Sequence, residues 1–272
     1  MHLCEPASNL YLEGTVLIDD RPKVALVTGA GSGIGRAAAI ALAGGGYIVI
    51  LAGRRMERLQ NVQAEIEARF GSQNPPYPIA TDVSDADQVA RLFDELQHRY
   101  RRLDLLFNNA GRGNPPGSFL DWSAHQWQEV VGTNINGMFY CLQAAFRLMS
   151  TQTPRGGRII NNGSLAAHTP RPNSPAYTAT KHAVTGLTKA ASLDGRQYDI
   201  AVGQIDIGNA MSELAGRMAD GVPQANGEIS AEPLIDVELV GQAVLRMANL
   251  PLEANVLFQT LMATKMPFVG RG

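Results

Sequence analysis

The stretch KVALVTGAGSGIG, residues 23–35, decides the fold of this chain. It begins with Lys23–Thr28, a short run rich in β-branched residues that predicts a buried strand, and continues into the glycine-rich turn TGAGSGIG at 28–35. Small apolar residues at 34–43 then predict a helix packed on a sheet. In parallel α/β sheets, ligands bind beyond the carboxyl ends of the strands. The free N–H groups and positive end of a helix that starts there favour a phosphate.

Three glycines of this turn suit a dinucleotide. Gly29 can make the tight turn, Gly33 can remove a Cβ that would face the pyrophosphate, and Gly35 can let the helix pack closely on the strand. Ile34 marks the start of the helix whose N–H groups would meet the phosphate. The spacing is GxxxGxG and differs from the GxGxxG fingerprint, so the turn alone is also compatible with an ordinary loop. Its place directly after the first strand favours a cofactor site.

Strand and helix patterns alternate along the rest of the chain. Further strands are expected at 47–52, 75–80, 103–107, 157–162, 200–205 and 256–260. Helices are expected at 56–70, 85–99, 123–150, 176–198 and 237–250. We predict Gly71 as a C-cap, Ser84 as an N-cap, and an interruption of the long helix near Gly132 and Gly137. Continuous apolar strands that alternate with helices indicate an α/β fold with a mainly parallel sheet covered on both faces.

One large domain fits the length of 272 residues better than two ordinary ones. Residues 1–22 show no strong period and are expected to form an N-terminal extension, followed by a single dinucleotide-binding catalytic domain at 23–272. The mixed composition of 209–235 makes it a candidate substrate lid. Either an apolar wall of the pocket or the buried side of that lid would be formed by Met211, Leu214, Met218 and Val222.

The composition excludes several classes of function. With 23 Lys+Arg, 25 Asp+Glu and a net charge of −2, the chain offers no long-range attraction for nucleic acid or anionic lipid. Cys4 and Cys141 form no CxxC pattern, so no disulfide framework or zinc site is expected and a reducing cytoplasm is the default location. Ala37–Gly53 is apolar but too short to span a membrane, and Gly44–Gly46 break it. We therefore expect no metal, no nucleic acid and no membrane partner.

The residues after the second strand bear on the choice of cofactor. An acid about 20 residues beyond the glycine turn would hold the ribose hydroxyls of NAD, but this chain has Gly53-Arg54-Arg55 there. A guanidinium can pair with a 2′-phosphate that a carboxylate would repel, which favours NADP and leaves NAD possible. Alternatively, both arginines are solvated at the start of a helix. Arg36 is a weaker candidate for the same phosphate, and Asp82 would either accept a hydrogen bond from the adenine amino group or serve only as a cap.

Six motifs, in this order and spacing, resemble the short-chain dehydrogenase/reductase family: TGAGSGIG at 28–35, Asp82-Val83, NNAG at 108–111, Asn134, Ser164, and YTATK at 177–181. The resemblance covers roughly residues 23–260. It implies a Rossmann-like doubly wound fold with a seven-stranded, mainly parallel sheet flanked by helices on both faces, usually in a homotetramer or homodimer. The catalytic set that it implies is Ser164, Tyr177, Lys181 and Asn134. With the glycine turn and the arginine, the expected cofactor-binding residues are Gly29, Gly33, Ile34, Gly35, Arg54, Asp82, Val83, Asn109, Ala110, Gly111, Tyr177, Lys181 and Ser212.

Tyr177 and Lys181 lie one helical turn apart, which suits acid–base chemistry on an alcohol or carbonyl. The tyrosine hydroxyl can pass a proton to or from a substrate oxygen, and the neighbouring ammonium stabilises the phenolate. Ser164 can donate a hydrogen bond to the same oxygen, and the family assigns to Asn134 a water in a proton relay with Lys181. Taken singly, each element has an ordinary structural explanation. A tyrosine and a lysine one turn apart are common on helix surfaces, a serine after a strand is commonly a turn residue, and an asparagine in a helix can be a cap. Asn108–Gly111 are expected to stabilise the turn after the fourth strand and to line the cofactor cleft.

One segment departs from the family pattern, which after the sixth strand usually has Pro-Gly and then a threonine that touches the nicotinamide carboxamide. Ile207 replaces the proline, which leaves the rigidity of the turn open, and Ser212 stands where the threonine hydroxyl is expected. Three further side chains are candidates to approach the substrate pocket: Phe119, Trp122 and His168.

These patterns predict an NAD(P)-dependent oxidoreductase that interconverts an alcohol and a ketone or aldehyde by hydride transfer, with Tyr177 as the acid/base. The alternative is a catalytically silent relative that binds a dinucleotide as a sensor or scaffold. The intact set of Ser164, Tyr177, Lys181 and Asn134 argues against it, because a binding module needs no proton relay. An S-adenosylmethionine methyltransferase fits poorly, since residues 54–55 are basic where its ribose is usually held by an acid.

Overall fold

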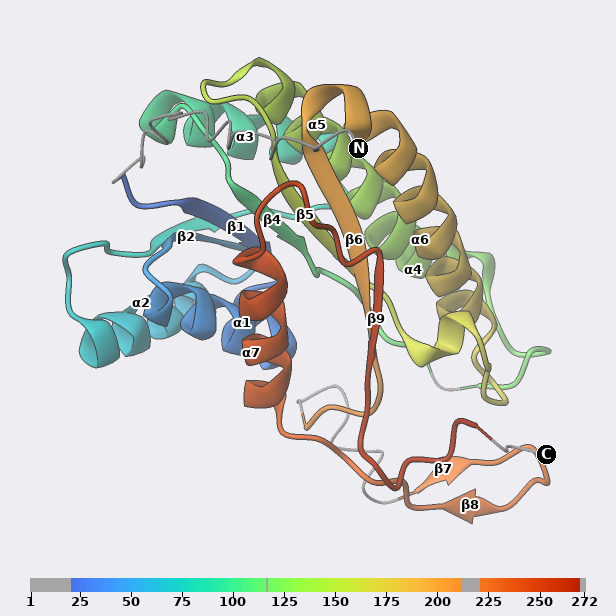
Figure 1. Ribbon diagram of the computed structural model, residues 1–272. Coiled ribbons are helices and arrows are strands. Elements are labelled where there is room, and N and C mark those ends of the chain that lie inside the picture. Colours follow the sequence, from blue (N-terminus) through green and yellow to red (C-terminus); the bar gives the residue numbers. More distant parts are fainter. Residues whose placement is uncertain (1–20, 116, 212–220, 270–272) are drawn as a thin grey trace, which may run out of the picture.

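The computed structural model describes residues 21–115, 117–211 and 221–269. Its centre is a seven-stranded sheet of order β3-β2-β1-β4-β5-β6-β9, in which all neighbouring strands run parallel (Figure 1). The chain steps outward from β1 to β3, returns to β4 beside β1, and then steps outward the other way. This is the doubly wound, Rossmann-like arrangement that the sequence predicts. The strands are Val24–Thr28 (β1), Ile48–Gly53 (β2), Tyr77–Ala80 (β3), Leu105–Asn108 (β4), Gly157–Asn162 (β5), Ile200–Ile207 (β6) and Phe258–Leu261 (β9).

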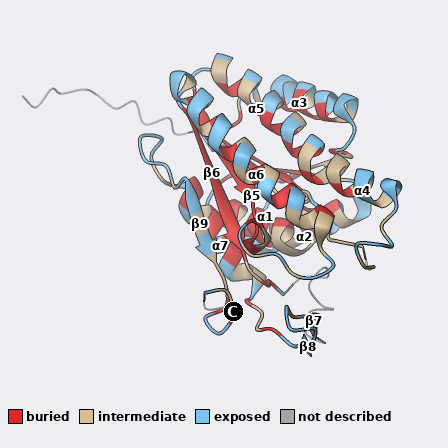
Figure 2. Cartoon of the chain, turned by 90° about the vertical axis from the view of Figure 1, so that its right-hand side faces the viewer, coloured by how far each residue is buried: buried red, intermediate tan, exposed pale blue. Residues whose placement is uncertain are grey.

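Helices cover both faces of the sheet, also as predicted (Figure 1). On one face lie α1 (Gly33–Gly44), α2 (Met56–Phe70) and α7 (Val237–Ala248). The other face carries α3 (Ala86–Tyr100), α4 (Ala124–Val131), α5 (Met138–Thr151) and α6 (Pro175–Asp194). Most helices bury the stripe that meets the sheet, and Figure 2 shows red strands between helices whose outer sides are blue. The α1 helix is an exception, with Ala37–Leu42 buried all round.

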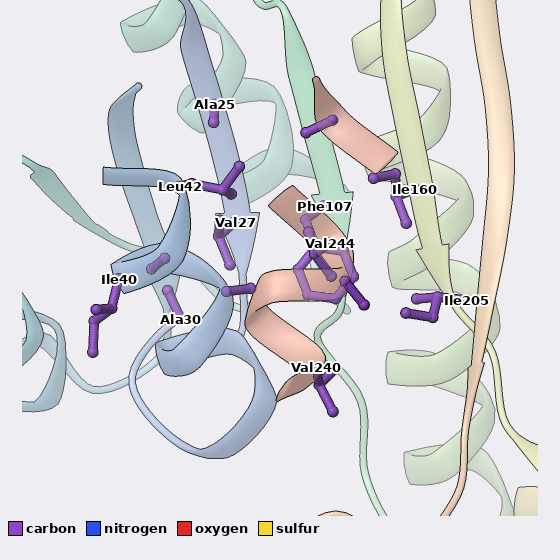
Figure 3. Close-up of a cluster of buried hydrophobic side chains, with 14 of the residues drawn as sticks. Ala25, Val27, Ala30, Ile40, Leu42, Phe107, Ile160, Ile205, Val240 and Val244 are labelled. Carbon is purple, nitrogen blue, oxygen red and sulfur yellow. The ribbon is translucent and has the colours of Figure 1, made fainter. Parts of the chain in front are cut away.

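Each face of the sheet has its own apolar core. The α1/α2/α7 side packs Val27, Phe107 and Ile160 of the strands against Val240 and Val244 of α7, as Figure 3 shows. The opposite side contains Leu26, Leu106 and Ile159 with residues of α3 and α5. Strands buried on both faces explain the nearly continuous apolar runs from which they were predicted.

The long helix predicted at 123–150 is broken where the glycines suggested. The α4 helix ends at Val131, residues Gly132–Gly137 form a π-helical turn (η1), and α5 starts at Met138. The backbone at Gly137 packs closely on Val83, because a Cβ on Gly137 would lie 2.7 Å from Val83 Cγ2. A π-turn inside a helix is common at functional sites, and this one contains Asn134.

Two helix ends test the predicted caps. Gly71 ends α2 with a φ of 79°, as expected for a glycine C-cap. The prediction of Ser84 as an N-cap is wrong, because the cap of α3 is Asp85, whose carboxylate accepts the N–H groups of Asp87 and Gln88. The Ser84 hydroxyl donates instead to Asp82 Oδ1, at 2.7 Å.

The end of β6 shows how the segment around Ile207 is ordered without the family's proline. The strand runs two residues beyond the predicted end at 205, and Ile207 pairs with Leu261 of β9. The N–H of Gly208 then donates to the Leu261 carbonyl at 2.8 Å. Strand pairing therefore orders this segment in place of a proline.

The helix predicted at 176–198 ends earlier, at Asp194, and continues as a 3-10 turn (η3, Gly195–Tyr198).

The candidate lid is described only in part. Residues 212–220, which include Ser212, Leu214 and Met218, lie outside the described residues. The segment beyond them forms a short antiparallel hairpin of β7 (Val222–Pro223) and β8 (Ile229–Ser230), which the sequence did not predict. In the described part of the chain, every helix is too short or too polar to cross a lipid bilayer.

Candidate active site

A cavity of about 1040 Å³ opens at the carboxyl ends of the parallel strands. Its walls include residues that follow β1, β2, β3, β4, β5 and β6 in turn. Long-range sheet topology thus gathers residues far apart in sequence at one edge. The predicted site residues among those that line it are Gly29, Gly33, Ile34, Gly35, Arg54, Asp82, Val83, Asn109, Ala110, Gly111, Ser164, Tyr177 and Lys181.

The glycine turn is held in a form that side chains would disrupt. Gly29 and Gly33 have φ values of 68° and 51°, in the left-handed region that favours glycine. At Gly35 the constraint is space, because a Cβ there would lie 2.2 Å from the Gly29 carbonyl oxygen. The turn therefore folds back on the start of α1, as the roles predicted for these glycines require.

The start of α1 fits an anionic group. Within the described residues, the N-cap Ser32 has extended backbone angles and its side chain makes no capping hydrogen bond. Gly33, Ile34 and Gly35 follow it on the cavity wall. The first N–H groups of a helix lack intrahelical partners and carry partial positive charge. A pyrophosphate of a dinucleotide suits this position.

Arginines form the cavity wall after β2. Arg54 and Arg55 are exposed and form no ion pair within the described residues, and Arg58 lies beside them on the wall. Arg58 lies in the first turn of α2 and carries no local motif that marks it in the sequence. Arg36 is not brought to the cavity, because Glu65 accepts its Nε at 2.8 Å and Glu238 lies 3.7 Å from its Nη1.

The NNAG segment closes the turn after β4, as expected. Thr28 Oγ1 accepts the N–H groups of Asn109 and Ala110, both at 2.9 Å. The Asn109 amide donates to the Thr28 carbonyl at 2.8 Å, and its Oδ1 accepts from Asn162 Nδ2 at 2.8 Å. Asn108 donates to the Met138 carbonyl. These bonds join the ends of β1, β4 and β5 into one rigid floor beneath the cavity.

Asp82 and Val83 lie on the wall after β3. Asp82 Oδ1 accepts both the N–H and the hydroxyl of Ser84, at 3.0 and 2.7 Å. The carboxylate therefore orders its own loop while it faces the cavity. Both roles weighed for this residue, a local cap and a cofactor contact, are compatible with the geometry.

Tyr177, Lys181 and Ser164 meet at the end of the cavity near β5 and β6. Lys181 is buried, and its Nζ donates to the Asn162 carbonyl at 2.7 Å and lies 5.5 Å from the centre of the Tyr177 ring. Ser164 is buried at the end of β5, where its Oγ accepts the Ala166 N–H at 3.1 Å. An oxygen that accepts one bond still has its own proton to donate. The arrangement can place a phenol, an ammonium and a hydroxyl around one substrate oxygen.

Asn134 lies beside this cluster without lining the described cavity wall. Its Oδ1 accepts the Arg112 N–H at 2.7 Å, and its Nδ2 donates to the Arg112 carbonyl and to Thr180 Oγ1. Thr180 Oγ1 in turn donates to the Tyr177 carbonyl. The side chain of Asn134 thus joins the π-turn to the helix that carries Tyr177.

The cavity wall includes Arg171 and Asn209, which the sequence did not mark as site residues. Arg171 donates to Asn209 Oδ1 at 2.9 Å and pairs with the buried Glu232. Burial alone would raise the pKa of Glu232, but hydrogen bonds from Gln224 and Asn209 and the Arg171 charge lower it overall. None of these residues has a local motif that marks it. The described wall does not include Phe119, Trp122 or His168.

Comparison with known proteins agrees with this site. The family model described as short chain dehydrogenase matches residues 23–222. The chain is 35% identical over 223 residues to a 3beta-hydroxysteroid dehydrogenase of Mediterraneibacter gnavus, covering 82% of this chain and 79% of the relative. It is 37% identical over 202 residues to the 3-oxoacyl-(acyl-carrier-protein) reductase FabG of Staphylococcus aureus, covering 73% and 78%. A solved metagenomic short-chain oxidoreductase in complex with NADP is 28% identical, with a TM-score of 0.74 over 89% of this chain and 97% of that one.

This chain therefore belongs to the short-chain dehydrogenase/reductase family. It is an NAD(P)-dependent oxidoreductase that acts on a hydroxyl or carbonyl group of a small molecule.

Proposed function

We propose that this enzyme interconverts an alcohol and a ketone or aldehyde, with NADP(H) as cofactor and Tyr177 as the acid/base. The observation that carries the proposal is the convergence of Tyr177, Lys181 and Ser164 on the same cavity as the glycine turn. A bound nicotinamide supplies or accepts the hydride. The protein's side chains must then orient the substrate oxygen and transfer one proton to or from it.

Each side chain has a defined part in that proton transfer. In reduction the Tyr177 hydroxyl donates its proton to the carbonyl oxygen of the substrate, and in oxidation it takes the proton back. The Lys181 ammonium stabilises the phenolate, and Ser164 donates a hydrogen bond that orients the substrate oxygen. For Asn134 we retain the relay role that the resemblance implies; its side chain also fixes the π-turn against the helix that carries Tyr177 and Lys181.

The preference for NADP over NAD rests on charge. Arg54 and Arg55 line the cavity wall after β2, where the 2′ position of the ribose is expected, and Arg58 adds a third guanidinium. A 2′-phosphate can form charge-assisted bonds with such groups. The similar metagenomic enzyme was solved with NADP, which agrees with this assignment.

The cavity favours a small or medium substrate with mixed polarity. Leu165, Pro172 and Met266 supply apolar wall beyond the reacting groups, and Asn173 and Ser174 supply polar wall. The Arg171 charge is compensated by Glu232, so this arginine does not demand an anionic substrate. The similar proteins named for hydroxysteroid and oxoacyl substrates define the classes to try first.

The remaining assignments also belong to this proposal. We keep residues 1–22 as an extension and 23–272 as one catalytic domain, with a cytoplasmic location and a homotetramer or homodimer as the working assembly. The lid proposed at 209–235 is supported by Val222 and Pro223, which line the cavity; Ser212, proposed to contact the cofactor, lies outside the described residues.

The test is steady-state kinetics of the wild type and Tyr177→Phe with NADPH and NADH. The substrates are a panel of a 3-ketosteroid, a 3-oxoacyl thioester, and aliphatic and aromatic ketones and aldehydes. The variant should lose roughly 100- to 10,000-fold in kcat while it still binds cofactor in isothermal titration. Full activity without the hydroxyl would remove Tyr177 from the mechanism. Tight cofactor binding with no turnover by the wild type on any substrate would favour the silent sensor instead.

A further inference from the structure

A buried carboxyl group accepts a hydrogen bond from the backbone of Ser164. Asp206, near the end of β6, is 1% exposed. Its Oδ1 accepts the backbone N–H of Ser164 at 2.9 Å and Gln204 Nε2 at 2.7 Å. Its Oδ2 lies 3.0 Å from His168 Nε2. Hydrogen bonds to both oxygens compensate the burial of this carboxyl group.

The Asp206 carboxyl group packs closely against the backbone of Gly163. A Cβ on Gly163 would lie 2.0 Å from Asp206 Oδ1 and 2.6 Å from Gln204 Nε2. Gln204 is itself fixed from α6, since it donates to Thr185 Oγ1 at 3.0 Å and accepts from Thr188 Oγ1 at 2.9 Å. The position of Asp206 is therefore determined jointly by β5, β6 and α6.

Ser164 depends on this support. The residue lies where β5 has ended and the 3-10 turn η2 (Leu165–Ala167) begins, so no strand partner holds its N–H. Without Asp206 that N–H would be a buried donor with no acceptor, and the backbone would shift to find one. A displacement of a catalytic group by about 1 Å can cost about 100-fold in rate. His168 ties the other carboxylate oxygen to the loop that follows η2.

We propose that Asp206 is a positioning residue for the reaction, which acts by fixing Ser164 through its backbone amide. The inference rests on the role proposed above for Ser164. It gives a role to a buried carboxyl group that lies beside the active site without lining the cavity. It also explains the need for glycine at position 163.

A double-mutant cycle tests the coupling. Kinetics with one substrate from the panel are measured for wild type, Ser164→Ala, Asp206→Ala and the double variant. Asp206→Ala should lower kcat roughly 10- to 100-fold, with cofactor KM changed less than about threefold, since Asp206 does not line the cavity. On the Ser164→Ala background, the same change should cost less than about threefold, because the residue through which it acts is already gone.

Two further variants separate positioning from general loss of structure. Asp206→Asn keeps an Oδ1 acceptor for Ser164 and should recover kcat to within about fivefold of wild type; it also serves if Asp206→Ala does not fold. Asp104→Ala is the matched control, because Asp104 Oδ2 accepts the Val24 N–H at 2.8 Å at the opposite, amino-terminal edge of the sheet. It should lower Tm but leave kcat unchanged.

The outcomes distinguish this inference from the proposed function. Equal losses from Asp206→Ala on both backgrounds, or equal losses in kcat from Asp206→Ala and Asp104→Ala, would overturn it. So would full activity of Asp206→Ala while Ser164→Ala is inactive, which leaves the role of Ser164 intact. If Ser164→Ala is itself fully active, the serine has no catalytic role and the proposed function fails at that residue first.

Discussion

Lys181 Nζ donates to the main-chain carbonyl of Asn162 at 2.7 Å, so that a helix ammonium is anchored on the last residue of a central strand. The side chain is 5% exposed, and its Nζ lies 5.5 Å from the centre of the Tyr177 ring. The carbonyl compensates part of the cost of burying the charge. The ammonium is thereby held beside the phenol whose proton the reaction moves.

Replacement of this ammonium should therefore abolish most activity. Lys181→Met keeps the length of the side chain and removes the charge, and we expect kcat to fall roughly 100- to 10,000-fold. Cofactor turnover is measured by the absorbance of the reduced nicotinamide. Lys189→Met, on the same helix but on an exposed position, is the matched control and should retain full activity. A Lys181→Met enzyme that keeps its kcat would show that the phenol needs no cation.

Reversal of one charge should change the cofactor preference. Arg54→Asp places a carboxylate where we assign the 2′-phosphate, so repulsion replaces a charge-assisted bond. We expect the NADPH/NADH ratio of kcat/KM to fall roughly 10- to 100-fold or more. Arg196→Asp makes the same charge change in η3, directly before the amino-terminal end of β6, and should leave the NADPH/NADH ratio unaltered. An unchanged ratio in Arg54→Asp would mean that Arg54 and the phosphate never meet.

Two glycine substitutions should act in opposite directions. In Gly35→Ala the new methyl group would lie 2.2 Å from the Gly29 carbonyl oxygen, so the turn must deform. We expect a loss of about 1–3 kcal/mol in stability and weaker cofactor binding by isothermal titration. Gly186→Ala, within α6, meets no atom within 4 Å and should stabilise the protein by about 0.4–1 kcal/mol. Thermal melts that show both variants alike would contradict the packing seen at Gly35.

The ion pair at Glu232 makes a prediction about pH. Burial would raise the pKa of this carboxyl, but hydrogen bonds from Gln224 and Asn209, at 3.1 and 2.8 Å, and the charge of Arg171 bring it below its ordinary 4.5. A depressed pKa in the folded state means that the unfolded chain binds the proton more readily. The stabilisation is therefore complete above about pH 4.5 and is lost as the pH falls through the folded value.

Glu232→Gln removes this titration. Its Tm should be lower than that of the wild type at neutral pH and should decline less steeply below pH 4.5. Glu253→Gln, exposed in the loop after α7, is the control and should follow the wild-type curve. Parallel curves for wild type and Glu232→Gln would show that the pair does not govern acid stability.

Sequence patterns were sufficient to predict features that depend on interactions between residues close together in the chain. The spacing of Tyr177 and Lys181 is set by the helical repeat, and the glycine turn after β1 is set by backbone conformation within a few residues. The break in the long helix was visible from Gly132 and Gly137, although its π-helical form was not. The alternation of apolar strands and helices was enough to predict the layers of the fold.

Errors arose where neighbouring residues compete for the same contact. Ser84 and Asp85 are both good N-cap residues, and the choice fell to Asp85 because Asp82 engages the Ser84 hydroxyl. Arg36 follows the glycine turn closely in sequence, yet carboxylates on α2 and α7 hold its guanidinium elsewhere. Neither outcome can be read from propensities, since each depends on distances across a loop or between helices.

The chain's own order of residues determined the strand–turn–helix units, the dinucleotide turn and the tyrosine–lysine pair, because each of these depends on neighbours within one or two turns. Only the folded sheet decided which distant residues support them. Asp206 reaches the Ser164 amide across 42 positions, and Glu232 reaches Arg171 across 61. Such contacts follow from the register of β5 against β6 and from the return of the chain over the cavity, and these are set by packing of the whole sheet.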